Sequence, residues 1–283
     1  YKQHQTARNI KIFPHHEILK KNGACFGVSG GYERPMWFSM DNQEPKYNYS
    51  YRYQNWYPSV EFETKNCRKN VGLFDLTPFS KFELKGEKAF EELQRICTAN
   101  IKNEPGKCVY TQMLNNDGGI EADVTIVCLE RNYFRIISSA ATRERDKFHI
   151  NKNLTTNIEL TDVTDKYCVF GLFGPKSREL ISSISKEDFS NKNFKFATGK
   201  KIKINNVETW VQRLSYVGEL GYEIYVEFDK AVEIYSLLIN EGKKYNISNC
   251  GMHSLDIMRM ENGFLHWGHD ISPEENQYQA GLE

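Results

Sequence analysis

Hydrophobic and polar residues alternate in several short segments of the chain, which is typical of half-buried β-strands. Strands are predicted at 71–86 with an interruption at Pro78, at 107–114, 120–127, 133–140 and 167–174, and as a pair around a glycine-bounded loop at 206–228. Two other segments repeat apolar residues at helical spacing, at 87–97 and 229–245, and helices are also predicted at 142–154 and 251–263. A short helix is also expected between residue 55 and Gly72, with Ser59 or Glu61 near its start, and another is expected to begin at Gly174-Pro175.

The strand predicted at 120–127 follows a turn with the sequence NNDGG and carries two carboxylates. If this strand is regular, one face holds Ile120, Ala122, Val124 and Ile126, and the other holds Glu121, Asp123, Thr125 and Val127. Asp123 should therefore point away from the apolar side. Periodicity alone is compatible with a solvated polar face. If that face is covered, a carboxylate there could accept a proton or stabilise a cation.

The order of these elements shows no regular βαβ alternation, which favours an α+β fold with mostly antiparallel sheets and flanking helices. A length of 283 residues favours two domains. A second unit is expected to begin near residue 160. Residues 1–55 are aromatic and are expected to be irregular. The chain opens without Met, so it is expected to be a piece of something longer.

Composition excludes several classes of protein. The chain has 37 Lys and Arg residues and 37 Asp and Glu residues, and this balance does not favour a nucleic-acid partner. Seven scattered cysteines form no C-x-x-C pair, so reduced thiols are expected rather than disulfides or structural zinc. No apolar run suggests a signal peptide or a membrane span. We therefore expect a protein that is not secreted and has no membrane partner.

Sequence motifs for common cofactors are missing. Neither GVSGG nor GELG completes a G-x-G-x-x-G fingerprint, so binding of FAD or NAD by that route is not expected, and there is no P-loop. His266, His269 and Asp270 have no partner cluster nearby in sequence. We therefore expect packing or hydrogen bonding there and no metal site.

A second group of carboxylates and tyrosines surrounds the loop of the 206–228 hairpin. Its members are Glu208, Tyr216, Glu219, Tyr222 and Glu223. A carboxylate can take two parallel hydrogen bonds from an amino-pyrimidinone edge, and a tyrosine ring can stack on a flat heterocycle. An exposed hairpin with charged strand residues explains the same pattern, so the composition of this hairpin leaves both interpretations open.

Several blocks in order resemble one known family over nearly the whole chain. The blocks are NVGLFDLTPFSKFELKG, YTQMLNNDGGIEADVTIV, FGPKSREL, VETWVQRLSYVGELGYEIYV and MRMENGFLHWGHDISPEEN. They are similar to the folate-binding aminomethyltransferases, the glycine-cleavage T-protein family. GACFGVSGGYERPMWF resembles in particular the folate-binding portion of dimethylglycine and sarcosine dehydrogenases. The resemblance implies the first two lobes of a three-lobed fold, with the third, a β-barrel, missing.

The resemblance also implies domain boundaries and residue roles. Residues 1–55 would connect to a preceding FAD domain, and 56–283 would form the folate-binding domain, split near 160 and truncated at its C-terminus. Asp123 would be catalytic, beside the pterin N5 nitrogen. The residues expected to bind the cofactor are Tyr110, Tyr216, Glu223, Glu208 and Trp267. A folate-contacting arginine of T-proteins would align with Leu255, and its absence fits the dehydrogenase branch better.

The function implied by the resemblance is tetrahydrofolate-dependent one-carbon transfer. In this branch an N-methyl amine is oxidised to an iminium by FAD in a preceding domain not present in this chain, and 5,10-methylenetetrahydrofolate forms. The expected partners are folate, the small N-methyl amine or its iminium, and the FAD domain. The location would be the cytoplasm in a bacterium or the mitochondrial matrix in a eukaryote. The alternatives are a T-protein aminomethyltransferase and a folate-binding module without catalysis.

Overall fold

A computed structural model describes residues 2–40, 43–156 and 158–282. The chain forms two compact units that interleave in sequence. The first comprises Tyr1–Pro78, Asp165–Phe196 and Lys201–Phe264, and the second comprises Phe79–Thr164, Ala197–Lys200 and Leu265–Glu283. We expected one boundary near residue 160. The chain changes unit there, between residues 164 and 165, and also at residue 78 and beyond residue 196.

The first unit is built on a six-stranded sheet and a separate two-stranded hairpin. The sheet has the order β10 (Gly199–Ile204), β11 (Val207–Gln212), β12 (Gly221–Glu227), β9 (Tyr167–Phe173), β3 (Val71–Asp75) and β13 (Ile247–Cys250). Only the pairing of β13 with β3 is parallel among the described strands. The hairpin consists of β1 (Ala24–Ser29) and β2 (Tyr32–Phe38).

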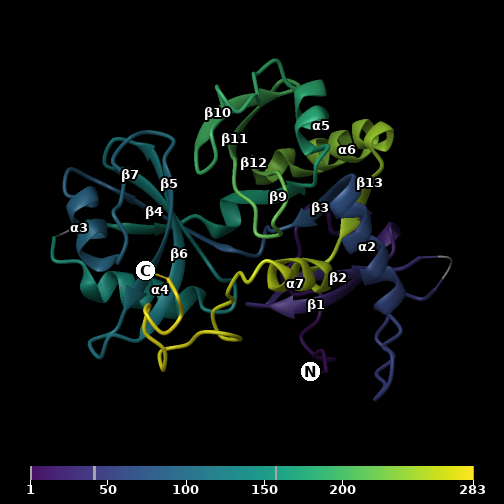
Figure 1. The fold of residues 1–283 in the computed structure, drawn as a ribbon, viewed down its shortest axis with the longest axis horizontal. Helices are drawn as coiled ribbons and strands as arrows, with labels where there is room; N and C mark the ends of the chain where they lie inside the picture. The colour runs from purple at the N-terminus through teal and green to yellow at the C-terminus, as the bar shows by residue number, and fades with distance from the viewer. Residues whose placement is uncertain (1, 41–42, 157, 283) are drawn as a thin grey trace. The chain divides into compact units, whose positions relative to one another are not determined.

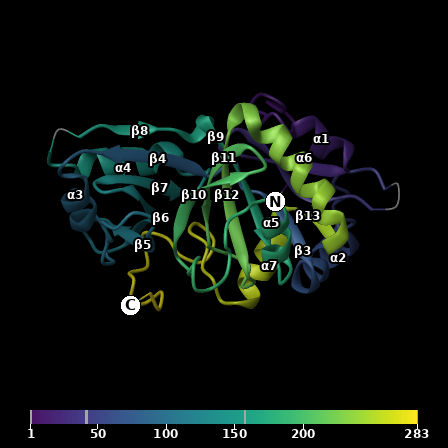
Figure 2. The ribbon, with the colours of Figure 1, turned by 90° about the horizontal axis from the view of Figure 1, so that it is seen from above.

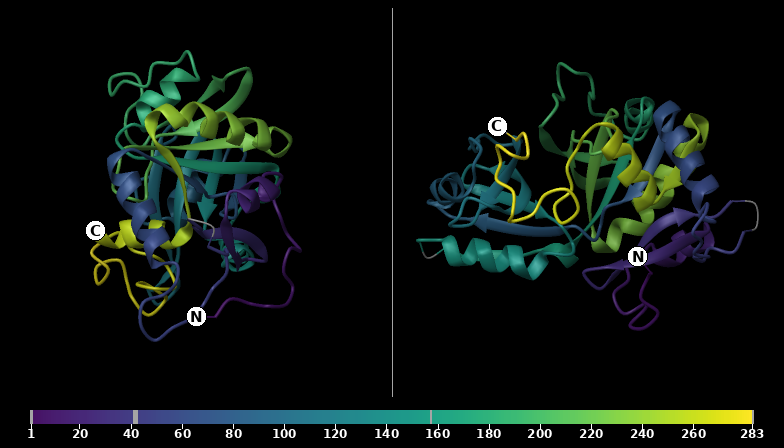
Figure 3. Two further views of the ribbon diagram at one scale, coloured as in Figure 1. Left: turned by 90° about the vertical axis from the view of Figure 1, so that its right-hand side faces the viewer. Right: turned by 60° about the horizontal axis from the view of Figure 1, so that its bottom comes forward.

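Helices cover both faces of the six-stranded sheet. On one face, α5 (Ser177–Ser183) and α6 (Ala231–Gly242) pack against β12 and close an apolar core that includes Leu172, Ile224 and Leu238 (Figure 1). Next to β3 and β13 lies α2 (Tyr57–Lys69), which also contacts α7 (Met252–Glu261). The hairpin follows the short α1 (His16–Lys21), and its strand β2 contacts α7 (Figure 3). Single turns of 3-10 helix occur at Thr164–Lys166, Phe228–Lys230 and Lys243–Tyr245.

The second unit is a five-stranded antiparallel sheet with two helices. The strand order is β5 (Cys108–Leu114), β6 (Ile120–Glu130), β7 (Tyr133–Ser138), β4 (Ser80–Lys85) and β8 (Leu160–Asp162). The helices are α3 (Ala89–Ile96) and α4 (Arg143–Asn153) (Figure 2). Leu93 of α3 and Ile150 of α4 join Val124 and Ile126 of β6 in one apolar cluster. Both helices therefore pack on the apolar face of β6.

The predicted elements are largely confirmed, and so is the α+β class with mostly antiparallel sheets. The expectation of an irregular segment over residues 1–55 is wrong, because this segment contains α1, β1 and β2. Gly30 and Gly31 both have positive φ, at 58° and 84°, which makes the two-residue turn of a hairpin. Tyr32 and Phe38 of β2 are buried in the same core as Phe13. Burial of these aromatic side chains orders the segment.

No helix among the described residues is both long enough and apolar enough to cross a membrane.

Candidate functional site

Asp123 lies on the face of β6 predicted from the sequence. Ala122, Val124 and Ile126 are each at most 3% exposed and belong to the apolar core, whereas Asp123 and Thr125 are partly exposed on the other face. The alternation is regular because β6 pairs with β5 residue by residue, with Gln112 opposite Asp123. The carboxylate therefore points away from α3 and α4, the helices of its own unit.

The carboxylate of Asp123 has one hydrogen-bond donor among the described side chains. The hydroxyl of Tyr110, on β5, donates to Oδ2 at 3.2 Å. Burial raises the pKa of Asp123 to about 6, and the hydrogen bond from Tyr110 opposes this rise. Asp146 on α4 also has a pKa raised to about 6, mainly by burial, and the negative charge of Asp123 contributes to that shift. Asp123 is therefore a carboxylate that holds a proton unusually well and is still ionised at neutral pH.

Trp267 is fastened to the beginning of the strand that carries Asp123. Its indole Nε1 donates to the carbonyl of Ile120 at 2.8 Å. The guanidinium of Arg145 lies 4.3 Å from the centre of the Trp267 ring and forms an ion pair with Glu121 at 2.7 Å. The sequence predicts Trp267 at this site. It gives no signal for Arg145, because no motif in its helix distinguishes this arginine from the other charged residues.

The NNDGG turn before β6 requires glycine at two positions. A Cβ atom on Gly119 would lie 1.9 Å from the carbonyl oxygen of Pro273, and Gly118 has a φ of +85°. The amide of Ile120 donates to the carbonyl of Glu275 at 2.9 Å. The segment that follows Trp267 thus packs directly on the turn and fixes the start of β6.

His266 and His269 stack on each other, with ring centres 4.3 Å apart, and the backbone amide of His266 donates to Asp270. Within the part of the chain that the structure describes, no group of three His, Cys, Asp or Glu side chains could hold a metal ion.

Glu223 in the first unit belongs to a hydrogen-bonded row across two strands. Its Oε2 accepts from Gln212 Nε2 at 2.8 Å and from the Tyr225 hydroxyl at 3.1 Å, and Trp210 Nε1 donates to Gln212 at 3.3 Å. Burial raises the pKa of Glu223, and the two donors oppose the rise. Oε1 accepts no hydrogen bond from the described residues, and Glu223 is partly exposed, so this oxygen is open to water or a ligand.

Tyr216 lies in the loop between β11 and β12, outside both strands, where its ring stacks on Phe264 at 6.0 Å. Arg68 on α2 fixes this loop by donating to the Val217 carbonyl at 2.5 Å and to Glu219 at 3.0 Å. The same guanidinium donates to Glu261 at 2.6 Å, at the end of α7. Arg68 therefore joins the Tyr216 loop to α7, and no sequence motif marks it.

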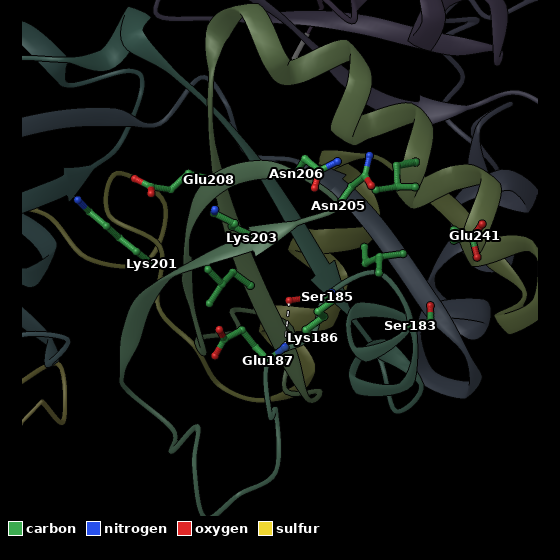
Figure 4. A pocket seen from close by; sticks show the side chains of 13 residues that line it. Ser183, Ser185, Lys186, Glu187, Lys201, Lys203, Asn205, Asn206, Glu208 and Glu241 are labelled. Carbon is green, nitrogen blue, oxygen red and sulfur yellow. Dashed lines mark hydrogen bonds between the residues drawn. The ribbon is translucent and has the colours of Figure 1, made fainter.

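Glu208 does not join Glu223. β11 is in register with β12 so that Gln212 lies opposite Glu223, and Glu208 stands on the same face four residues earlier, which is roughly 13 Å along the strand. Its exposed side chain lines a cavity of about 950 Å³ together with Lys201 and Lys203 (Figure 4). Because β11 ends at Gln212, Tyr216 lies beyond the strand and its direction is not set by the alternation along β11.

The arrangement supplies two different carboxylates. Asp123, with a raised pKa and one donor, suits proton transfer. Glu223, with one open oxygen beside aromatic side chains, suits recognition of N–H donors on a flat ring. Leu255, where an arginine was expected in T-proteins, is buried in α7 and offers only packing.

Comparison with known proteins identifies the family. Residues 15–283 match the GCVT N-terminal domain. The chain is 40% identical over 281 residues to a 4-methylaminobutanoate oxidase (formaldehyde-forming) of Paenarthrobacter nicotinovorans, covering 99% of this chain and 34% of that protein. It is 31% identical to the mitochondrial dimethylglycine dehydrogenase of Rattus norvegicus, covering 95% and 31% of the two chains. The chain thus spans about a third of the length of these curated relatives.

The chain covers a larger share of two shorter proteins. The aminomethyltransferase of Halothermothrix orenii is 32% identical, and the match covers 80% of this chain and 63% of that protein. The crystal structure of aminomethyltransferase T of the glycine cleavage system from Bartonella henselae has a TM-score of 0.80 at 22% identity. It matches 97% of this chain and 68% of that one, so the fold corresponds to part of that structure. The chain belongs to the GCVT family of folate-binding aminomethyltransferase domains.

Proposed function

We propose that this domain binds tetrahydrofolate and transfers a one-carbon unit to it as part of an N-methyl amine oxidase or dehydrogenase. Tetrahydrofolate would supply the nitrogen nucleophile that takes up the carbon of an iminium, giving 5,10-methylenetetrahydrofolate and the demethylated amine. The observation that carries the proposal is the raised pKa of Asp123 on the polar face of β6, with Tyr110 as its hydrogen-bond donor.

Asp123 would act on charge and on protons. An ionised carboxylate in a low-dielectric setting stabilises the positive charge of an iminium. Because its pKa is about 6, Asp123 is ionised at neutral pH and is still basic enough to take the proton that the attacking nitrogen loses. It can then return that proton to the departing amine. Tyr110 would keep the carboxylate in place throughout.

Glu223 and Tyr216 would recognise the pterin. The open Oε1 of Glu223 can accept an N–H from an amino-pyrimidinone edge, while Gln212 and Tyr225 hold the other oxygen. Tyr216, stacked on Phe264, offers an aromatic surface to a flat ring. Trp267 is assigned to the same ligand, and the exposed position of Glu208 makes it the weakest member of this set.

The one-carbon donor is an N-methyl amine, oxidised by FAD in another domain of a longer chain. Support comes from the names of the relatives that match almost the whole of this chain, an oxidase and a dehydrogenase of methylated amines. The location would be the cytoplasm in a bacterium or the mitochondrial matrix in a eukaryote, and the rat relative is named as a mitochondrial protein.

Asp123→Asn in the full-length enzyme tests the catalytic role. We expect amine oxidation and folate binding to persist, while methylenetetrahydrofolate formation falls by about a hundredfold or more, the usual contribution of general acid–base catalysis. Free formaldehyde should accumulate in its place, because the unused iminium hydrolyses. Unchanged methylenetetrahydrofolate formation with intact binding would show that Asp123 is not the catalytic group.

A T-protein aminomethyltransferase is the second candidate, supported by the likeness to the Halothermothrix orenii protein. Leu255 argues against it, since the resemblance places an arginine there in T-proteins. Transfer from an aminomethylated lipoyl protein, without any turnover of dimethylglycine, sarcosine or 4-methylaminobutanoate, would favour this candidate over the first.

A further inference from the structure

Arg34 on β2 is partly buried, and its guanidinium has no partner among the described residues. Its Nε is buried and has no hydrogen-bond partner, and none of the described residues forms a hydrogen bond or an ion pair with any atom of its side chain. An arginine cannot shed its proton, so burial without an anion is costly. Other arginines of the first unit have side-chain partners. Arg8, for example, is paired with Glu33 at 2.6 Å.

A β-bulge places Arg34 beside a second unsatisfied donor. β1 and β2 are paired Gly27 with Arg34 and Cys25 with Trp37, and the register shifts by one residue between these pairs. Gly27 and Cys25 are two residues apart, so Arg34 and Trp37 share one face of the hairpin although they are three residues apart. Trp37 is fully buried, and its Nε1 has only the sulfur of Cys25, a weak acceptor, beside it.

Aromatic rings from two other elements surround this face. The Tyr47 ring lies edge-on to Trp37 at 6.4 Å, and its hydroxyl bonds to Nε2 of His253 on α7 at 2.8 Å. Trp56 stacks on His253 at 5.5 Å. These rings suit a flat and partly apolar ligand.

The charge of the surroundings defines the ligand. Burial lowers the pKa of His253 to about 4, so its ring is neutral at pH 7. Asp256, the acidic group that acts on Arg34, already forms an ion pair with Arg259 at 2.8 Å. Among the described residues, Arg34, Arg259 and Asp256 therefore carry one net positive charge. A single negative charge would neutralise it, and a planar carboxylate matches the fork of a guanidinium.

We propose that Arg34 binds the carboxylate of a small ligand between the β1–β2 hairpin and α7. Two ligands of the proposed function, on which this inference rests for its choice of probes, carry such a group. One is the glutamyl tail of folate, and the other is the carboxylate of an N-methyl amino acid. Arg34 lies near Asp256 in the middle of α7, and Asp256 is ion-paired with Arg259 one turn later. Arg259 in turn donates to the carbonyl of Phe264, whose ring stacks on Tyr216. Within the first unit, α7 therefore spans the carboxylate site and the proposed pterin surface.

The first test uses sodium acetate, whose effect does not depend on the folate hypothesis. We expect acetate, compared with chloride at equal ionic strength, to raise the melting temperature of the wild-type protein and to leave Arg34→Gln unchanged. In buffer without carboxylates, Arg34→Gln should melt at or above the wild-type temperature, because a partly buried, unpaired charge has been removed. Equal protection of both proteins, or a lower melting temperature of the variant without ligand, would overturn the proposal.

The second test distinguishes the two sources by calorimetric titration. The probes form two pairs whose members differ in the presence of a carboxylate, namely 5-formyltetrahydrofolate with its dimethyl ester, and 4-methylaminobutanoate with N-methylbutylamine. Arg34→Gln should raise the Kd about tenfold or more for the carboxylate-bearing member of one pair, the loss expected for one charged hydrogen bond, and should leave its carboxylate-free counterpart unaffected. The pair that is affected identifies the ligand whose carboxylate Arg34 binds. Equal effects within both pairs would overturn the proposal.

Two further variants complete the design. Arg34→Lys keeps the charge without the fork and should retain protection by acetate while losing part of the affinity for the larger probe. Arg178→Gln is the matched control, since Arg178 already donates to Asn191 and the Tyr222 hydroxyl, and should behave as wild type. If acetate protects wild type but no folate binds, the carboxylate site stands and the proposed function fails. If methylenetetrahydrofolate forms normally and its formation does not depend on Arg34, the proposed function stands and the carboxylate site fails.

Discussion

Asp123→Asn is expected to stabilise the folded protein while it removes the proposed chemistry. Burial raises the pKa of Asp123 from 3.8 to about 6, so the folded state resists ionisation of this carboxyl group. The contribution of Asp123 to stability is therefore fully present below pH 3.8 and is lost as pH rises through 6. Asparagine does not ionise, and its side-chain oxygen can still accept the hydrogen bond from Tyr110.

The size of the effect follows from the shift. At 1.36 kcal/mol per pKa unit, a rise from 3.8 to about 6 corresponds to a loss of about 3 kcal/mol at pH 8 and only about 1 kcal/mol at pH 4.5. The wild-type protein should thus lose about 2 kcal/mol more than Asp123→Asn between these two pH values. Loss of the Asp123 charge also lowers the pKa of Asp146, which adds to the gain.

Urea unfolding of both proteins at pH 4.5, 6 and 8 measures this difference as a change in the free energy of unfolding. Glu121→Gln is the matched control. Glu121 lies on the same face of the same strand and is ion-paired with Arg145, so its replacement should cost at most about 1 kcal/mol and show no gain at pH 8. If Asp123→Asn is less stable than wild type at pH 8, the ionised carboxylate is well satisfied in the fold and the argument from burial is refuted.

Three further outcomes are expected. Tyr110→Phe removes the hydrogen bond that lowers the pKa of Asp123, so the half-maximal pH of kcat/KM should move above 6; a shift to lower pH would contradict the assignment. Arg68→Gln should free the Tyr216 loop, raising the Kd for tetrahydrofolate about tenfold with little change in kcat and reducing the free energy of unfolding by about 2 kcal/mol. Glu63→Gln should reduce the free energy of unfolding by about 2–4 kcal/mol, since an amide cannot accept from donors on both sides, and a loss below about 0.5 kcal/mol in urea titration would count against this.

The local structure around Asp123 could be predicted because it depends on alternation and on a turn. The period of two along 120–127 assigns Asp123 and Val124 to opposite faces, and the sheet core confirms that assignment. Helices with a clear apolar stripe, such as α3 and α6, were predicted for the same reason. In each case the information lies within ten to fifteen consecutive residues.

The features that could not be predicted depend on residues far apart in sequence. Arg68 fixes a loop some 150 positions later, and neither its helix nor that loop contains a pattern that pairs them. The β1–β2 hairpin was missed for a different reason. Gly30-Gly31 is a hairpin turn signal, but the strands beside it are buried on both faces and do not alternate. Hydrophobic periodicity does not identify such strands, and the two glycines of the turn were the sequence feature that indicated the hairpin.

Glu63 and Glu223 differ in how completely the fold satisfies their carboxylates, and this difference separates a structural role from a ligand-binding one. Glu63 uses both oxygens, accepting from the Phe38 amide, the Gly251 amide and the Ser254 hydroxyl at 2.7–2.8 Å, so it joins β2 to the first turn of α7. Glu223 has two donors on one oxygen and none among the described residues on the other. A buried polar group that the fold satisfies completely stabilises that fold, whereas one satisfied in part lowers stability unless a ligand completes it. Glu223 and Arg34 are partly exposed and are satisfied only in part by the described residues, and they carry opposite charges on separate parts of one unit. A ligand that binds both must therefore present donors at one end and a carboxylate at the other.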